Sequence, residues 1–145
     1  MTPFLDSTAF RVYAAVSAVL VLKMAVLAFA TATVRGVHKQ YPNPEDARFL
    51  KGDHAPDHDT VARIKRAHAN AMENEPLFMV LGLLYTLLGA NPMGMQIYAY
   101  TFLTARVIHS LCYVFKLQPF RSLSWVVGAL CLVGMSVQVL LRAFN

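Results

Sequence analysis

Three polar side chains follow one another at helical spacing just before an apolar stretch of the sequence. Residues 63–76 read RIKRAHANAMENEP and lead without a break into the apolar residues 77–88. A helix that continues through both parts would carry Arg66, Asn70 and Glu73 along one face, at positions i, i+4 and i+7. Ionisable groups inside a membrane are costly and usually functional. We therefore expect the chemistry of this chain to take place along that face.

A second polar stripe lies further along the chain, at Arg106, His109 and Tyr113, which are spaced i, i+3 and i+7. Counting about 1.5 Å per helical residue from the helix ends places both stripes at a similar depth, in the cytoplasmic half of a bilayer. Three more polar residues are expected at this level, at the ends of the other two helices: Arg35, Arg121 and Ser122. The sequence thus predicts an arginine-rich site within an apolar protein.

Arg106 is expected near the middle of the membrane, where a charge costs about 2.5–3.5 kcal/mol on insertion scales. Such a charge needs a partner. Glu73 is the carboxylate that we expect within the membrane, so we predict a structural ion pair between Glu73 and Arg106. Lys23 is a further cation in an apolar stretch, and its role stays open.

The composition is typical of an integral membrane protein. Of the 145 residues, 57% are apolar and 14% are charged, which leaves too little polar surface for a soluble domain of this size. Four stretches are candidates for membrane spans: residues 9–34, 76–88, 95–115 and 123–144. The second is too short to cross alone, so its helix must include the polar lead-in and bury part of it. We expect an all-α integral membrane fold, a four-transmembrane-helix bundle that forms one domain over residues 1–145, with a linker-like stretch at 36–59.

The positive charge is unevenly distributed along the chain, whose net charge is +5. Seven of the 13 lysines and arginines lie within or beside the first loop: Arg35, Lys39, Arg48, Lys51, Arg63, Lys65 and Arg66. The connection after Gly89 has none, and the third connection carries Lys116 and Arg121. The positive-inside rule then places the first and third loops in the cytoplasm and both termini outside. Aromatic and basic residues do not alternate as in nucleic-acid-binding modules, so we expect no nucleic-acid partner.

The chemistry of the predicted site suits a small anionic cosubstrate that meets a lipid-soluble partner. Arginine offers paired N–H donors to carboxylates. Nearby cations and a hydroxyl donor lower the pKa of a thiol and favour the nucleophilic thiolate. A thiol tripeptide with two carboxylates fits both requirements.

Four strings of the sequence resemble the MAPEG family, the membrane-associated proteins in eicosanoid and glutathione metabolism. They are PNPEDA at residues 42–47, RAHxNxxEN at 66–74, LLYTLLGANP at 83–92 and ARVIHSLCY at 105–113. The resemblance is to the branch of glutathione transferases and prostaglandin E synthases. It implies a homotrimer of four-helix subunits, with one glutathione bound between neighbouring subunits near the cytoplasmic face.

The resemblance also implies roles for single residues. Glutathione contacts are implied for Arg35, Arg66, Asn70, Glu73, His109, Tyr113, Arg121 and Ser122. Arg121 and Ser122 would face the thiol and take part in catalysis. Asp46 matches an aspartate proposed to assist the synthase reaction, although it fits equally well as a turn or helix-cap carboxylate. The chain departs from the family pattern at four positions: Ala62, Ala69, Ala71 and Trp125.

These observations together predict glutathione conjugation, or peroxide reduction, of hydrophobic electrophiles and hydroperoxides that arrive from membrane lipids. One alternative is a glutathione-dependent isomerase of a prostaglandin endoperoxide, which PNPED favours and Trp125 disfavours. The other is a non-catalytic membrane scaffold or lipid-binding subunit, against which Arg121 and Tyr113 argue. We expect no metal, because His54, Asp57 and His58 lack a supporting ligand at a standard spacing.

Overall fold

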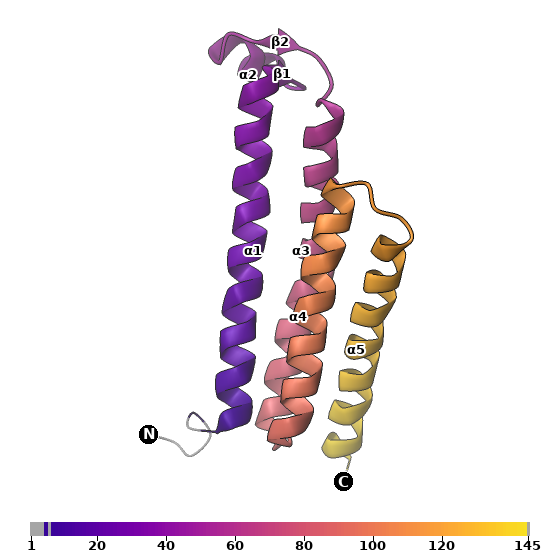
Figure 1. The fold of residues 1–145 in the computed structure, drawn as a ribbon. Coiled ribbons are helices and arrows are strands. Elements are labelled where there is room, and N and C mark those ends of the chain that lie inside the picture. Colours follow the sequence, from indigo (N-terminus) through magenta and orange to yellow (C-terminus); the bar gives the residue numbers. More distant parts are fainter. Residues whose placement is uncertain (1–4, 6, 145) are drawn as a thin grey trace.

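The computed structural model describes residue 5 and residues 7–144 of the predicted 1–145 domain. This part of the chain forms five helices and two short strands (Figure 1). In chain order they are α1 (Thr8–His38), β1 (Gln40–Tyr41), α2 (Pro44–Phe49), β2 (Asp53–His54), α3 (Asp59–Leu87), α4 (Pro92–Val114) and α5 (Phe120–Ala143). The protein is therefore all-α apart from one two-residue strand pair.

Capping or turn residues mark one end each of the long helices α1, α3 and α4. Ser7 and Asn91 accept hydrogen bonds from the first turns of α1 and α4 through their side chains. Gly89 follows α3 with φ of +73°, a conformation that glycine adopts without strain. It therefore forms the turn between α3 and α4. As predicted, α3 runs unbroken from the polar lead-in into the apolar stretch, and it passes through Pro76.

The long helices pack side by side, with α4 and α5 on each other and α3 against α1, α4 and α5 (Figure 1). The core between them contains stacked Phe78 and Phe102 rings, whose centroids are 4.6 Å apart. Leu20, Met95 and Met135 are fully buried around these rings. This core fixes the rotation of each helix about its own axis, and so decides which polar side chains meet.

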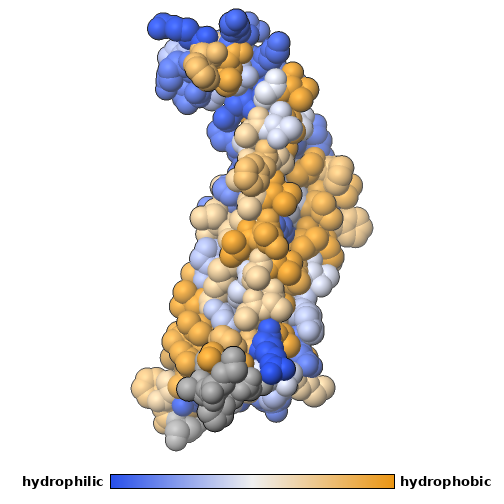
Figure 2. All heavy atoms as spheres, turned by 90° about the vertical axis from the view of Figure 1, so that its left-hand side faces the viewer, coloured by the Kyte–Doolittle hydropathy of each residue, from blue (hydrophilic) through white to orange (hydrophobic). Residues whose placement is uncertain are grey.

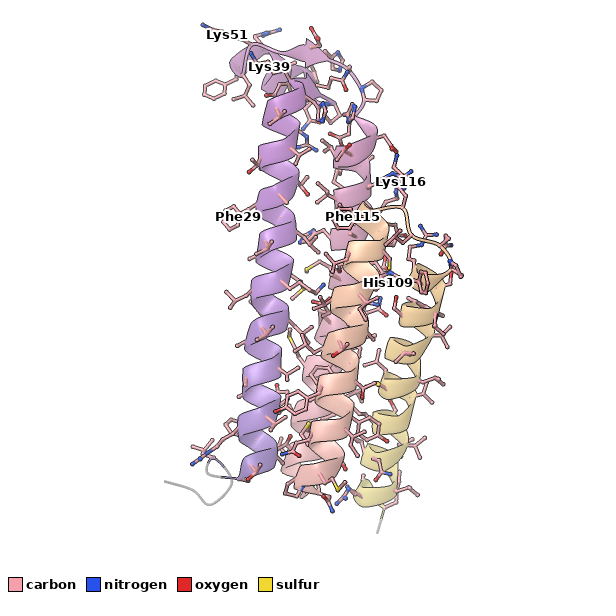
Figure 3. The ribbon with its side chains drawn as sticks, viewed as in Figure 1. Phe29, Lys39, Lys51, His109, Phe115 and Lys116 are labelled. Atoms are coloured by element: carbon pink, nitrogen blue, oxygen red, sulfur yellow. The ribbon has the colours of Figure 1, made fainter. Side chains whose placement is uncertain are left out.

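The surface of the long helices is strongly apolar. Among the described residues, α1 and α5 are the helices that are long and apolar enough to cross a membrane by themselves. Figure 2 shows hydrophobic side chains along most of the face formed by α1, with hydrophilic ones gathered at the end that carries α2 and the strands. Phe29 is 73% exposed and points outward from α1, while Lys39 and Lys51 lie at the hydrophilic end (Figure 3). Lipid would cover such a surface at lower cost than water.

The stretch 36–59, where the sequence suggested a linker, contains the end of α1 and a small folded cap made of β1, α2 and β2. The two strands pair in parallel, with Gln40 opposite Asp53 and Tyr41 opposite His54. The Tyr41 ring is buried against Gly52, where any side chain would overlap it. α1 has 31 residues, about 46 Å at 1.5 Å per residue, and so it exceeds a hydrocarbon core of ~30 Å. The cap therefore lies beyond the apolar part of the protein.

Candidate active site

Five of the residues predicted to contact glutathione lie around one pocket. The pocket has a volume of about 470 Å³ and lies where α3, α4 and the start of α5 meet. Its lining consists of Asn70, His109, Tyr113, Arg121, Ser122, Trp125 and Val126. The short connection between α4 and α5 reverses the chain, so that the last turns of α4 face the first turn of α5.

Arg121 and Tyr113 form the cationic side of the pocket. The guanidinium carbon of Arg121 lies 4.7 Å from the centre of the Tyr113 ring, which is a cation–π contact. The ring of His109 meets Tyr113 edge-on, with centroids 5.4 Å apart. Arg121 and Ser122 are in the first turn of α5, where the helix dipole adds positive potential. An anion in this pocket would meet a fixed cation and a phenol.

The carbonyl group of Arg121 is held from two sides. His109 Nδ1 lies 2.9 Å from this oxygen, and Ser124 Oγ donates a hydrogen bond to it at 2.9 Å. Because a carbonyl only accepts, Nδ1 must carry the ring proton, and Nε2 of the neutral ring is then an acceptor. These bonds fix the first turn of α5 and thereby the direction of the Arg121 side chain. Sequence reasoning did not identify Ser124.

Arg106 lies behind the pocket and not in it. Its side chain is 1% exposed, and Nη2 donates to the backbone oxygen of Asn70 at 3.3 Å and to the Asn70 side-chain Oδ1. Its ion-pair partner is Glu75, with Nε and Oε1 3.9 Å apart. The Arg106 guanidinium therefore orients a pocket residue from the interior of the protein.

The predicted pair of Arg106 with Glu73 is wrong. Glu73 is exposed, because the buried face of α3 follows Ala67, Ala71, Glu75 and Phe78 at helical spacing. Glu73 lies two residues from Glu75 and so points about 200° away from it. Ala67, Ala71 and Glu75 share one helical face, and this alanine-containing face is the sequence signal that points to Glu75.

Arg35 and Arg66 lie closer to the cap. Arg35 binds both oxygens of Asp57, with Nε at 2.8 Å and Nη2 at 3.1 Å, and Lys65 Nζ lies 2.8 Å from the same carboxylate. A separate hollow of about 350 Å³ is lined by Asp57, Ala62, Lys65, Arg66 and Ala69. Burial raises the pKa of Asp57, but the hydrogen bonds from Arg35 and Lys65 outweigh it and hold the pKa below its ordinary value. Arg66 is half exposed and lies 3.8 Å from Asp59.

Asp46 and Glu73 do not reach the pocket of their own chain. Asp46 is in α2 and accepts a hydrogen bond from Asn43 at 3.0 Å. Of the residues weighed as metal ligands, His54 contacts the Pro42 carbonyl and His58 stacks on His38. Within the described part of the chain, no three potential ligand side chains come together.

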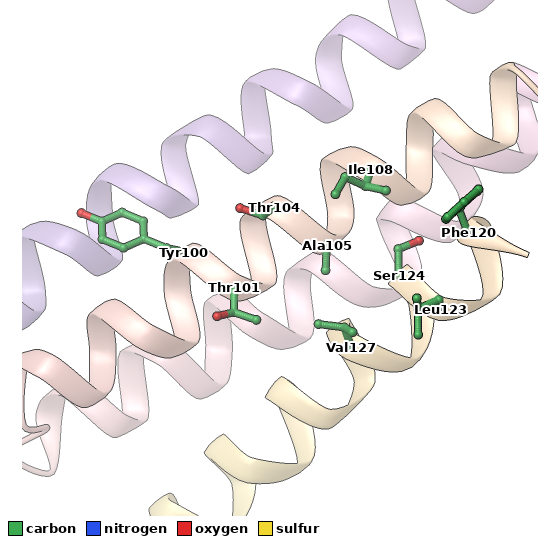
Figure 4. Close-up of a pocket in the computed structure, with 9 residues that line it drawn as sticks. All are labelled: Tyr100, Thr101, Thr104, Ala105, Ile108, Phe120, Leu123, Ser124 and Val127. Atoms are coloured by element: carbon green, nitrogen blue, oxygen red, sulfur yellow. The ribbon is translucent and has the colours of Figure 1, made fainter. Parts of the chain in front are cut away.

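An apolar pocket of about 500 Å³ lies on another side of the α4–α5 junction (Figure 4). Its lining is Tyr100, Thr101, Thr104, Ala105, Ile108, Phe120, Leu123, Ser124 and Val127. Ser124 belongs to this lining, and its Oγ lies 3.4 Å from Nδ1 of His109, which lines the polar pocket. The contact between Ser124 and His109 therefore lies between the apolar pocket and the cationic pocket.

Apolar helices around a cationic, tyrosine-containing pocket are the features of an all-α membrane protein. Comparison with known sequences gives the family: the MAPEG profile matches residues 13–141, and the chain belongs to the MAPEG family. It is 35% identical to human microsomal glutathione S-transferase 1, over 97% of this chain and 94% of that protein. It is 36% identical to human prostaglandin E synthase, over 96% and 93% of the two chains, and 39% identical to the horse synthase, over 88% and 84%.

Proposed function

We propose that this protein is a membrane-bound glutathione transferase that also reduces hydroperoxides with glutathione. One observation carries the proposal: Asn70, His109, Tyr113, Arg121 and Ser122 come from three helices and line one cationic pocket. The similarity to a microsomal glutathione S-transferase supports glutathione as the cosubstrate. We propose that Arg35, Arg66 and Glu73 also contact glutathione.

The site is completed, in this proposal, by a second copy of the chain in a homotrimer. Glu73 and the Arg66 side chain are exposed in the single chain, and Arg35 lies near the cap. A neighbouring subunit would cover these side chains and enclose glutathione between the two chains. Asp46, which lies outside the pocket of its own chain, would then act on the pocket of a neighbour.

The proposed reaction begins with loss of the thiol proton to water, after which Arg121 stabilises the negative charge on sulfur and Ser122 donates a hydrogen bond to it. In conjugation, the thiolate attacks an electrophilic carbon, a carbon–sulfur bond forms and the leaving group departs with its electron pair. In peroxide reduction, two glutathiones and one hydroperoxide give glutathione disulfide, an alcohol and water. The lipophilic substrate reaches the site from membrane lipids.

We further propose a single domain of four membrane-spanning helices, with the first and third loops in the cytoplasm and both termini outside. The start of α1 and the end of α5 lie at the same end of the molecule, opposite the cap (Figure 1). Basic residues gather at the cap end, and Lys116 Nζ reaches Asp59 at 3.1 Å there. Both features agree with an even number of spans and a cytoplasmic cap.

A second candidate function is the isomerisation of a prostaglandin endoperoxide with glutathione as cofactor. The 36% and 39% identity to prostaglandin E synthases favours it. Trp125 lines the pocket and is 45% exposed, and we propose that its large ring disfavours a bulky second substrate such as the endoperoxide. A non-catalytic scaffold is the third possibility, and it would not need an arginine fixed beside a tyrosine.

Turnover by the purified protein tests these functions against one another. Glutathione would be supplied with a chromogenic aryl halide, an organic hydroperoxide or a prostaglandin endoperoxide. We expect conjugation and peroxide reduction, accompanied by ultraviolet absorbance of the thiolate when glutathione binds near neutral pH. Turnover of the endoperoxide alone would favour the isomerase, and the absence of all turnover and of thiolate absorbance would favour the scaffold.

A further inference from the structure

A buried cluster of charges lies beside the proposed glutathione pocket and outside it. Glu75 of α3 is fully buried, and its Oε1 lies 2.6 Å from Lys23 Nζ of α1 and 3.9 Å from Arg106 Nε of α4. Lys23 Nζ also donates to Ser110 Oγ at 2.9 Å. One carboxylate thus joins three helices, and none of the proposed chemical steps uses it.

Arg106 connects this cluster to the pocket. Its Nη2 donates to two oxygens of Asn70, the backbone oxygen at 3.3 Å and the side-chain Oδ1. Gly128 of α5 packs on the stem of the same side chain, since a Cβ at this glycine would lie 3.3 Å from Arg106 Cδ. The guanidinium is therefore confined between helices, with Glu75 as its ion-pair partner.

The contact with Arg106 determines how the Asn70 amide is turned. A carboxamide carries its acceptor oxygen and its NH₂ donor group on opposite sides of one carbon. Because Arg106 binds Oδ1, the Nδ2 hydrogens of Asn70 face away from the guanidinium. The flipped amide would place its donors against the donors of Arg106, so the flip is disfavoured. Asn70 lines the pocket together with Tyr113 and Arg121.

We propose that Glu75 is a positioning residue for the glutathione reaction. Through Arg106 it fixes the amide of Asn70, so that the Nδ2 hydrogens bind a carboxylate of glutathione. Without Glu75, the Arg106 guanidinium would lose its countercharge in a low-dielectric interior and would move away from Asn70, whether or not Lys23 is present. This inference rests on the proposed function of the pocket.

The test is the variant Glu75→Gln in the full-length protein, purified in detergent. We expect the Kd and the KM for glutathione to rise about tenfold, the cost of one lost hydrogen bond to a charged group. The kcat and the thiolate absorbance at saturating glutathione should stay within about twofold, because Arg121 is untouched. A matched control is Met135→Ala, which removes a fully buried core side chain away from the charge cluster and should lower the melting temperature with KM unchanged.

Two further variants separate positioning from stability. In Lys23→Met with Glu75→Met, both members of the closest pair are replaced, so the melting temperature should recover in part. The KM for glutathione should stay raised, because Arg106 still lacks its countercharge. In Asn70→Ala, the added change Glu75→Gln should raise the KM no further, because both changes remove the same contact.

Three results would overturn the inference: a wild-type KM in Glu75→Gln, a KM that recovers together with stability in the double variant, or additive effects with Asn70→Ala. Failure of the wild-type protein to bind glutathione would instead overturn the proposed function of the pocket, and the inference with it.

Discussion

Arg121 is positioned through its main chain as well as its side chain. Its carbonyl oxygen accepts bonds from His109 and Ser124, while its guanidinium lies over the Tyr113 ring. The main-chain contacts do not depend on the identity of the side chain at position 121. A substitution here can therefore remove the cation and leave the start of α5 in place, which makes Arg121 a suitable residue for testing catalysis apart from folding.

Arg121→Leu should lower kcat/KM for conjugation by about 10²–10³-fold, the usual effect of losing one charge-stabilising group at a water-poor site. Thiolate absorbance on adding glutathione should be lost as well. Ser122→Ala should reduce activity less, because the cation remains. Melting temperature and oligomeric mass serve as controls and should match the wild type. If thiolate formation and turnover were undiminished, Tyr113 would become the next candidate donor.

Asp57→Asn should make stability less dependent on pH under acidic conditions. The pKa of Asp57 is lower in the folded protein than the value of about 3.9 for a free Asp. Its carboxylate therefore contributes stability that is fully present above pH ~4 and is lost as the pH falls through the folded pKa. The melting temperatures of wild type and variant should differ at pH 6 and converge toward pH 3. A gap that stays constant over this range would exclude the ion pair with Arg35 as its cause.

α3 carries polar residues on two faces, and only one of them is buried. The buried face contains Glu75 and continues through Phe78 into the core, while Glu73 lies on an exposed face. Three helices meet at Glu75, so its charge affects how α1, α3 and α4 pack on one another. The same helix thus provides one carboxylate for the structure and one that the proposal assigns to glutathione.

Glu75→Gln should destabilise the protein in detergent, and Glu73→Gln should not. Removing one partner of a buried ion pair costs about 3–5 kcal/mol, because the remaining charges lose their compensation. An exposed glutamate without such partners contributes little. Thermal unfolding of both variants provides the measurement, and each variant is the control for the other. Equal melting temperatures for the two would contradict the difference in burial.

The whole molecule has an apolar middle and a hydrophilic cap at one end (Figure 2). α1 and α3 extend beyond α4 and α5 at this end, and they carry the strand pair and α2 (Figure 1). The Arg35–Asp57 pair joins the end of α1 to the segment that precedes α3. The proposed pocket lies between the cap and the middle, where a water-soluble tripeptide and a lipid-soluble substrate can both arrive.

A cysteine at position 54, in the exposed cap, should be labelled by a membrane-impermeant maleimide only from the cytoplasmic side. Met93→Cys provides the matched control, because Met93 is 67% exposed at the opposite end and should be labelled from outside. The expectation follows from the basic residues near the cap and their absence between Gly89 and Gln96. Labelling of the cap from outside intact cells would reverse the proposed orientation.

Several features of the protein could be predicted from the sequence by itself. The helical character of residues 63–88 follows from local spacing, and α3 confirms one continuous helix there. The stripe of His109 and Tyr113 is a property of a single helix, so its two residues had to share a face. The family follows from local strings, and the profile match confirms it.

Other features depend on contacts between segments that are distant in sequence. Whether Glu73 or Glu75 meets Arg106 depends on the rotation of α3 about its axis, and a two-residue difference turns a side chain by about 200°. That rotation is set by packing of small and aromatic side chains such as Ala71 and Phe78 against other helices. The bond from His109 to the Arg121 carbonyl likewise needs the chain reversal after α4. Local sequence sets which faces a helix has, and only tertiary packing decides which of them is buried.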